Sequence, residues 1–232
     1  MTPPESQHEA DCEATYSARN AALSTFGEVD DFVLTHLINP MFMGGPAWPN
    51  TRQAYTVTRG ELAGRPVTLL ASDALSDPFD DSWEGAPRVQ GFELEMFAVG
   101  TPDSAEKGSW LLPLVQQASM QAAHHQGIRA LLDEMGVLSM ELWDVPIPEE
   151  HRGDWCVDEG RVGVLIGATH PAVPASFDGP LGTVRLVHLM LLSAAETRAV
   201  VSGGPDVRSA LAEAIRSRPD GLISRFDRDP LL

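Results

Sequence analysis

Four aspartates stand close together within the stretch SDALSDPFDD: Asp73, Asp77, Asp80 and Asp81. They directly follow the apolar run VTLL, and carboxylates at the end of a strand could bind a metal ion or act as a catalytic acid. Their spacing lacks the alternate ligands, the central glycine and the terminal glutamate of a calcium-binding loop. Ser-Asp-Pro favours a turn, because short polar side chains bond to nearby backbone groups and Pro78 fixes φ. The sequence therefore predicts a turn in which Asp73 and Asp77 bond to backbone groups, with no metal site and no cofactor.

The histidines do not form a pair with metal-ligand spacing. His124 and His125 are adjacent on a predicted helix, so their side chains point about 100° apart and cannot chelate one ion as residues four apart would. We expect both at the surface or at an edge. His188 lies within the apolar run TVRLVHLMLL, which predicts a hydrogen-bonded core histidine rather than a catalytic one.

Other catalytic signatures fail as well. Ser139 has no G-x-S-x-G context and lies inside the strand-like run VLSMEL. The run GRVGVLIG at 160–167 does not have the spacing of a dinucleotide-binding loop. Cys12 and Cys156 give neither a disulfide framework nor metal-type spacing, which fits a reducing compartment. These patterns predict no enzyme.

The N-terminal region is predicted to be helical. Residues 5–23 form a polar helical segment with few large apolar residues, and 28–38 form a second short helix with Phe32, Val33, His36 and Leu37 on one face. The stretch NPMFMGGPAWPN at 39–50 is typical of a loop. We therefore expect a helical segment over 1–40 followed by a domain over 41–232.

The remainder of the chain mixes strands and helices. Strands are predicted for a hairpin at 53–72 and for 91–99, 137–143, 162–167, 183–194 and 221–226, and helices for 109–123, capped by Ser109, and 206–217. Alternation in GFELEMF places Glu93 and Glu95 together on a solvent-exposed face. This mixed order predicts an α+β domain with a largely antiparallel sheet flanked by helices.

Charge narrows the possible partners of the chain. The 232 residues include 33 acidic and 16 basic ones, a formal net charge of −17, which repels nucleic acid and anionic membranes. An acidic surface could instead attract a basic protein, or serve solubility alone. The sequence has no apolar stretch of the roughly 18–20 residues that span a membrane and no secretory signal, so a cytoplasmic location is expected.

Several segments, in order and spacing, resemble the suppressor-of-fused family, particularly its bacterial single-domain members. They are VTLLASDALSDPFDD, GFELEMF, SWLLPLVQQAS, GVLSMELWDVPIPE and PLGTVRLVHLMLLSAAE, followed by LAEAI and GLISRFDRD. The resemblance covers about residues 30–229 and implies a mixed α/β domain that holds other proteins without enzymatic activity. Bacterial relatives have been proposed as immunity proteins that neutralise a toxin.

Three hypotheses about function remain open. The first is a protein-binding module, concretely an immunity protein for a basic toxin, whose contact residues are Asp77, Phe79, Asp80, Asp81, Trp83 and Glu84. Phe79 and Trp83 could equally pack the turn onto the sheet. The second is a metal-binding or hydrolytic enzyme that uses the loop from Asp73 to Asp81. The third is a structural or oligomeric component without a ligand.

The acidic loop gives a first test of the binding hypothesis. Changing Asp80, Asp81 and Glu84 together to Lys should slow association with a basic partner, because steering weakens, while the free energy of unfolding stays within about ±0.5 kcal/mol. Trp83→Ala should act mainly on dissociation. Stopped-flow association at several salt concentrations measures this, and an unchanged rate and salt dependence in the triple variant would place the contact elsewhere.

Overall fold

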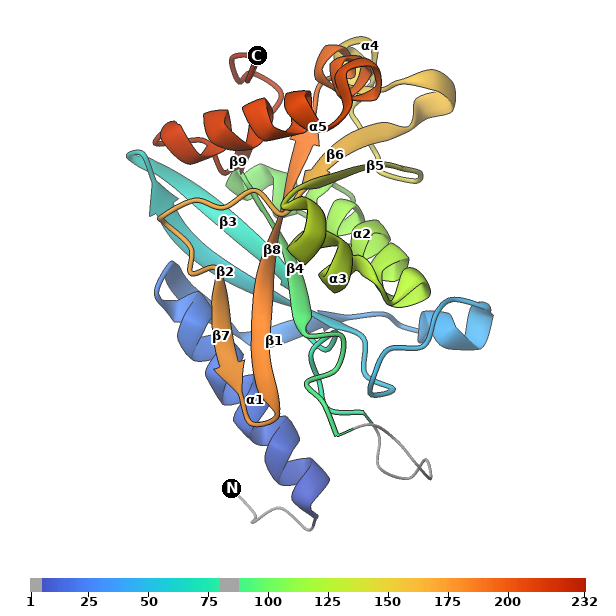
Figure 1. The fold of residues 1–232 in the computed structure, drawn as a ribbon, viewed down its shortest axis with the longest axis vertical. Helices are drawn as coiled ribbons and strands as arrows, with labels where there is room; N and C mark the ends of the chain where they lie inside the picture. The colour runs from blue at the N-terminus through green and yellow to red at the C-terminus, as the bar shows by residue number, and fades with distance from the viewer. Residues whose placement is uncertain (1–5, 80–87) are drawn as a thin grey trace.

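The computed structural model describes residues 6–79 and 88–232, which form one mixed sheet with helices on both faces (Figure 1). The strand order is β1-β2-β3-β4-β8-β6-β5, with β7 paired to β8 and β9 paired to β4. The strands are β1 (Gly27–Thr35), β2 (Ala54–Leu62), β3 (Arg65–Ser72), β4 (Leu94–Gly100), β5 (Leu138–Leu142), β6 (Val162–Ile166), β7 (Ser176–Gly179), β8 (Gly182–Leu192) and β9 (Ile223–Ser224). Only the β4–β8 and β4–β9 pairs are parallel. The predicted α+β class with a largely antiparallel sheet is confirmed.

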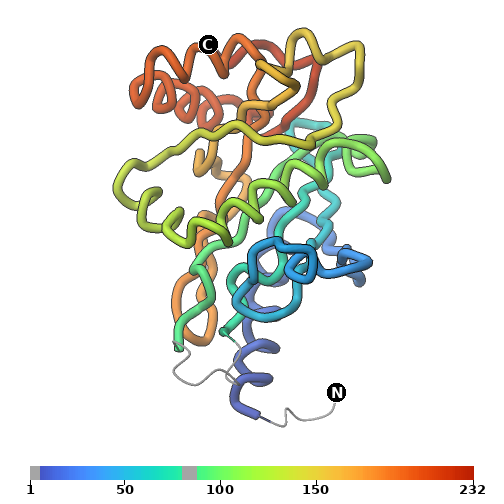
Figure 2. Tube along the Cα trace, turned by 90° about the vertical axis from the view of Figure 1, so that its right-hand side faces the viewer, coloured from blue at the N-terminus to red at the C-terminus, as the bar shows by residue number. Residues whose placement is uncertain are grey.

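Five α-helices and four short 3-10 helices accompany the sheet in the described ranges. They are α1 (Gln7–Ser24), α2 (Leu111–His125), α3 (Ile128–Met135), α4 (Arg152–Trp155) and α5 (Ala194–Ser217), with η1 (Pro40–Met43), η2 (Pro102–Ala105), η3 (Glu149–His151) and η4 (Asp158–Gly160). None of the helices in these ranges has the length and apolarity needed to cross a membrane. In Figures 1 and 2 the start of α1 and the C-terminal end of the chain lie at opposite ends of the molecule.

The sheet buries a hydrophobic core on each face, and strand parity divides the side chains between them. On β8, Val187, Leu189 and Leu191 belong to the core under α2, whereas Leu186 and Met190 belong to the core that α1 and α5 cover. A strand covered on both faces is apolar at successive positions, which explains the unbroken run in β8.

Most predicted elements are confirmed, including the hairpin β2–β3 and the helix α2 with Pro113 in its first turn. The cap is different, because Trp110 rather than Ser109 precedes α2 and no side chain caps it. The helix predicted for 206–217 is the second part of the longer helix α5, which is kinked at Gly204, where φ is 59°.

The second N-terminal helix was a wrong prediction, because residues 27–35 form the strand β1. This strand pairs antiparallel with β2 over its length, apart from a register shift between Val29 and Val33. The two backbones come close where Gly27 faces Gly60, and a Cβ on Gly27 would lie 2.1 Å from the carbonyl oxygen of Arg59. Residues 27–35 therefore form a strand because they pair with β2, although the spacing of their apolar residues is helical.

His188 is a core histidine, as predicted. It is 1% exposed on β8, opposite Phe97 of β4, and its Nε2 lies 3.2 Å from the carbonyl oxygen of Leu222. Since a carbonyl only accepts, the neutral ring carries its proton on Nε2. Burial lowers the pKa of His188 to about 3.

This buried histidine should weaken the fold in acid. Between pH 6.5 and about 3, His188 binds a proton in the unfolded chain but not in the folded one. The free energy of unfolding therefore decreases as the pH falls. The loss should approach about 1.4 kcal/mol per pH unit between roughly pH 6 and 4. In urea denaturation, the His188→Gln variant should not show this pH-dependent loss, whereas the exposed control His124→Gln should show it. Equal pH slopes in all three proteins would contradict it.

Candidate functional site

Asp73, Asp77 and Glu95 converge beneath α1. Along β3 and β4, Leu69, Ala71, Phe97 and Val99 belong to the core on the α1 and α5 face. With a period of two, Glu95 and the first residue after β3, Asp73, point to that same face. Two chain-distant carboxylates therefore meet where α1 covers the sheet.

The helix α1 turns a largely polar stripe towards these carboxylates. Its buried side chains Asp11, Thr15, Arg19 and Leu23 are spaced by four residues and so lie on one face. Ser6 caps the helix in a reciprocal arrangement with Glu9.

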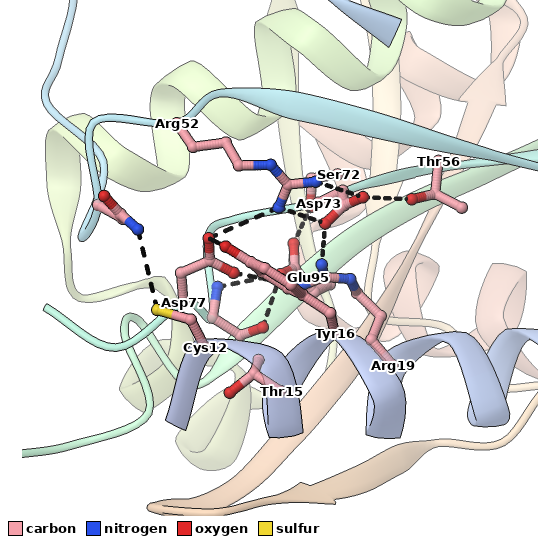
Figure 3. A network of polar contacts seen from close by, with 12 residues as sticks. Cys12, Thr15, Tyr16, Arg19, Arg52, Thr56, Ser72, Asp73, Asp77 and Glu95 are labelled. Atoms are coloured by element: carbon pink, nitrogen blue, oxygen red, sulfur yellow. Dashed lines mark hydrogen bonds and ion pairs between the residues drawn. The ribbon is translucent and has the colours of Figure 1, made fainter. Parts of the chain in front are cut away.

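The guanidinium group of Arg19 binds three carboxylates (Figure 3). Its Nη2 contacts Asp73, and its Nη1 lies 3.4 Å from Asp77 Oδ1 and 3.2 Å from Glu95 Oε1. The Arg19 side chain is 1% exposed, and the three carboxylate side chains are at most 3% exposed. This is a buried ionic cluster that joins α1 to β3, β4 and the turn after β3.

A second arginine closes the cluster on its outer side. Arg52 binds Asp73 through two parallel hydrogen bonds of 2.9 and 3.0 Å, and its guanidinium lies 4.6 Å from the ring centroid of Tyr16. The Tyr16 hydroxyl donates to Asp77 at 3.2 Å, and Thr56 donates to Asp73 at 2.6 Å. Asp73 and Asp77 are thus bound by side chains from α1, β2 and the loop before β2.

Glu95 is the carboxylate that β4 contributes to the cluster, and its side chain is 0% exposed. Burial raises its pKa, and the charge of Asp77 adds to this, while Arg19 and the hydroxyls of Ser72 and Ser76 act in the opposite direction. Arg19 and Arg52, together with the hydroxyl donors around them, offset part of the cost of burying the three carboxylates.

Two expectations from the sequence are wrong at this site. The carboxylates of Asp73 and Asp77 bind arginines and hydroxyls rather than local backbone groups, although the Asp77 N–H does donate to the Ala74 carbonyl. Glu95 is fully buried, whereas only Glu93 is exposed. Alternation separated the two faces of β4, but it could not show that α1 covers the face of Glu95.

The residues predicted to contact a partner are placed only in part. Asp77 is 0% exposed, so its carboxylate has no surface to offer. Phe79 is half-buried, and its ring packs edge-on against Phe92 with centroids 5.9 Å apart. Asp80, Asp81, Trp83 and Glu84 lie outside the described residues. Their binding role stays a prediction.

The cluster can position elements, and its geometry does not favour catalysis. Its carboxylates are already saturated by donors, and Arg19 occupies the point between them that a cation would need. Among residues 6–79 and 88–232, no group of three or more His, Cys, Asp or Glu could hold a metal ion. Burial raises the pKa of the nearby Cys12 thiol to about 11, so it stays protonated near neutral pH.

Comparisons with known proteins identify the fold. No protein-family model matches the chain, and neither does any curated protein. The structure is similar to that of Drosophila Suppressor of Fused, with a TM-score of 0.52 and 13% identity over 94% of this chain and 51% of that one. It is also similar to a chain of the Sufu-Fu complex, with a TM-score of 0.51 and 15% identity over 95% of this chain and 92% of that one. The chain thus has a Suppressor of Fused-like fold and spans about half the length of the Drosophila protein.

Removing Arg19 should be far more costly than removing an exposed arginine. Arg19→Met leaves three carboxylates without their shared cation and should lower the free energy of unfolding by about 3–5 kcal/mol. The matched control is Arg59→Met, which breaks the well-formed but exposed pair with Asp30 and should change the free energy of unfolding far less. Urea denaturation at neutral pH measures both, and similar losses in the two variants would contradict the assignment of the cluster as the main anchor of α1.

Proposed function

We propose that this chain is a non-enzymatic protein-binding module of the suppressor-of-fused type and, more concretely, an immunity protein that holds a basic toxin in the cytoplasm. The observation that carries the proposal is the shared fold, since one similar chain comes from a complex of Sufu with Fu. The free thiols of Cys12 and Cys156 fit a reducing compartment.

The distribution of acidic residues supports a basic partner. Residues 133–160 contain nine acids and one arginine, and eight of the nine acids are exposed: Asp133, Glu134, Asp144, Glu149, Glu150, Asp154, Asp158 and Glu159. This surface extends from α3 through β5 to η4. Within 69–106, Asp73, Asp77 and Glu95 are buried against arginines, whereas Glu93, Asp103 and Glu106 are exposed. Among the described residues, 133–160 therefore hold the larger group of exposed acids that could attract a basic protein at long range.

The saturated cluster supports a non-enzymatic role. A general acid or base has to reach a substrate proton within hydrogen-bond distance. The carboxylates of Asp73, Asp77 and Glu95 are almost completely inaccessible, and each already accepts bonds from arginine, tyrosine or serine and threonine hydroxyls.

Co-purification with the tagged chain from its own cells, followed by kinetics on the recovered partner, tests the proposal. We expect a protein of positive net charge that arrests growth when produced alone and does not when this chain is present. Recovery of no protein, of an acidic protein, or of one whose growth effect the chain does not relieve would contradict the immunity role.

The association rate should depend on the acids of 133–160. Glu149→Lys with Glu150→Lys should slow association by about tenfold at low salt, because it inverts the local field. The control Asp206→Lys with Glu213→Lys changes the net charge equally at another exposed place and should slow association less. Equal slowing in both double variants would show that net charge alone matters.

A further inference from the structure

The large exposed apolar side chains gather along one segment. Of twelve such residues in the described ranges, six lie between 32 and 43, on β1, on η1 and on the connection between them: Phe32, Val33, Leu37, Ile38, Phe42 and Met43. We call these six residues the β1 patch. Phe32 is 59% exposed, Met43 is 78% exposed and Leu37 is completely exposed. Large exposed apolar surfaces of soluble proteins often mark binding sites, so a concentration of exposed apolar residues in one short segment is a candidate contact surface.

The patch continues from a free edge of the sheet. β1 is the first strand in the sheet order and pairs only with β2 among the described strands. An antiparallel pair leaves alternate N–H and C=O groups of the outer strand pointing away from its neighbour. The end of β1 next to the apolar connection is regular, since Val33, Leu34 and Thr35 pair in register with Thr56, Tyr55 and Ala54.

This edge has only part of the usual protection against pairing. Natural edges are often blunted by charged side chains, lysine above all, by proline, by bulges or by covering segments. No Lys or Arg occurs between Arg19 and Arg52, and β1 itself contains no proline. A register shift between Val29 and Val33 interrupts the strand, but it leaves the regular end free and Phe32 exposed.

The local charge indicates what the β1 patch would accept. Glu28 and Asp31 are exposed on β1, and the nearest arginine across the ladder, Arg59, is bound to Asp30 by bonds of 2.9 and 2.8 Å. A partner segment therefore meets apolar side chains flanked by carboxylates. Lysine or arginine between apolar residues complements this surface.

A second copy of this chain is a poorer occupant. Antiparallel pairing of β1 with itself would bring Glu28, Asp30 and Asp31 of each copy near the same acids of the other, and each copy carries a net charge of −17. Like charges placed opposite each other on neighbouring strands are destabilising.

We propose that β1 and the β1 patch bind an extended, basic segment of the partner protein, which adds to the sheet as a new edge strand beside β1. Backbone hydrogen bonds to the free edge align the segment, and its apolar side chains cover Phe32, Leu37 and Ile38. This proposal rests on the proposed function, because it names the surface through which a basic protein is held.

A synthetic peptide can test this surface directly. The probe is a fluorescent peptide of roughly ten residues that alternates Lys and Val, with two controls: a Glu and Val version, and a Lys and Val version N-methylated at alternate amides. Fluorescence anisotropy with the full chain should detect binding of the first peptide only, because the second is repelled and the third cannot complete the ladder. Equal binding of the N-methylated peptide, or no binding of the first, would overturn the proposal.

Substitutions on the chain locate the binding. Leu37→Ser with Ile38→Ser should weaken the Lys and Val peptide by about tenfold or more, since apolar anchors carry most of a contact's affinity. Val201→Ser, on an exposed apolar residue of α5, is the matched control and should leave binding unchanged. Circular dichroism and thermal unfolding confirm folding of both. Equal affinity in the double variant, or a wild-type dimer in sedimentation that this variant dissociates, would overturn the proposal.

The experiments distinguish a failure of the proposed function from a failure of the β1 proposal. If the partner recovered from cells binds the wild type and the Leu37→Ser, Ile38→Ser variant equally, the protein-binding function holds and the β1 proposal fails. If no partner is recovered but the peptide binds in a manner that depends on Leu37 and Ile38, the β1 surface holds and the proposed function fails.

Discussion

The buried guanidinium of Arg19 is the interaction on which the arrangement of this half of the molecule depends. Ionised carboxylates in a protein interior cost several kcal/mol each unless a cation and further donors accompany them. Arg52 accompanies Asp73 and Asp77 from the loop before β2, but Glu95 has its cation only because α1 brings Arg19 between the three carboxylates. An apolar helix face could slide with little loss, whereas this polar one fits in a single register. The end of β3, the turn that directly follows it and the start of β4 are therefore positioned together with α1.

The strands and helices that the sequence predicted correctly are those whose own side chains reveal their burial. Runs such as VTLL in β3 or VRLVHLMLL in β8 are apolar because both faces of these strands are covered. β1 failed this criterion, since Phe32, Val33 and Leu37 have helical spacing and remain exposed. Its conformation comes from pairing with β2, which lies many residues further along the chain. A local sequence pattern carries no information about that distant strand.

The site was predictable only as a place where carboxylates gather. Turn chemistry in SDALSDPFDD accounts for the chain reversal, but the partners of Asp73 lie in α1 and before β2. Period-two alternation likewise placed Glu95 on the correct face of β4. It predicted that this face is exposed to solvent, whereas α1 covers it. The missed signal was in α1, where large apolar residues are scarce and yet Asp11, Thr15 and Arg19 repeat every four residues. Such a stripe on an otherwise weakly amphipathic helix indicates polar docking against a charged partner.

The acidic residues therefore belong to two physically distinct populations. Those at 73, 77 and 95 are neutralised internally and add little to the field outside the molecule. Those at 133–160 are exposed around α3, β5 and η4, at the opposite end of the sheet order from β1 and its apolar patch. Long-range attraction depends on exposed charge, while tight contact depends on apolar groups that lose water. In this fold the two requirements fall at opposite ends of one sheet, so a protein held at β1 would be attracted by the whole molecule but anchored by a few side chains.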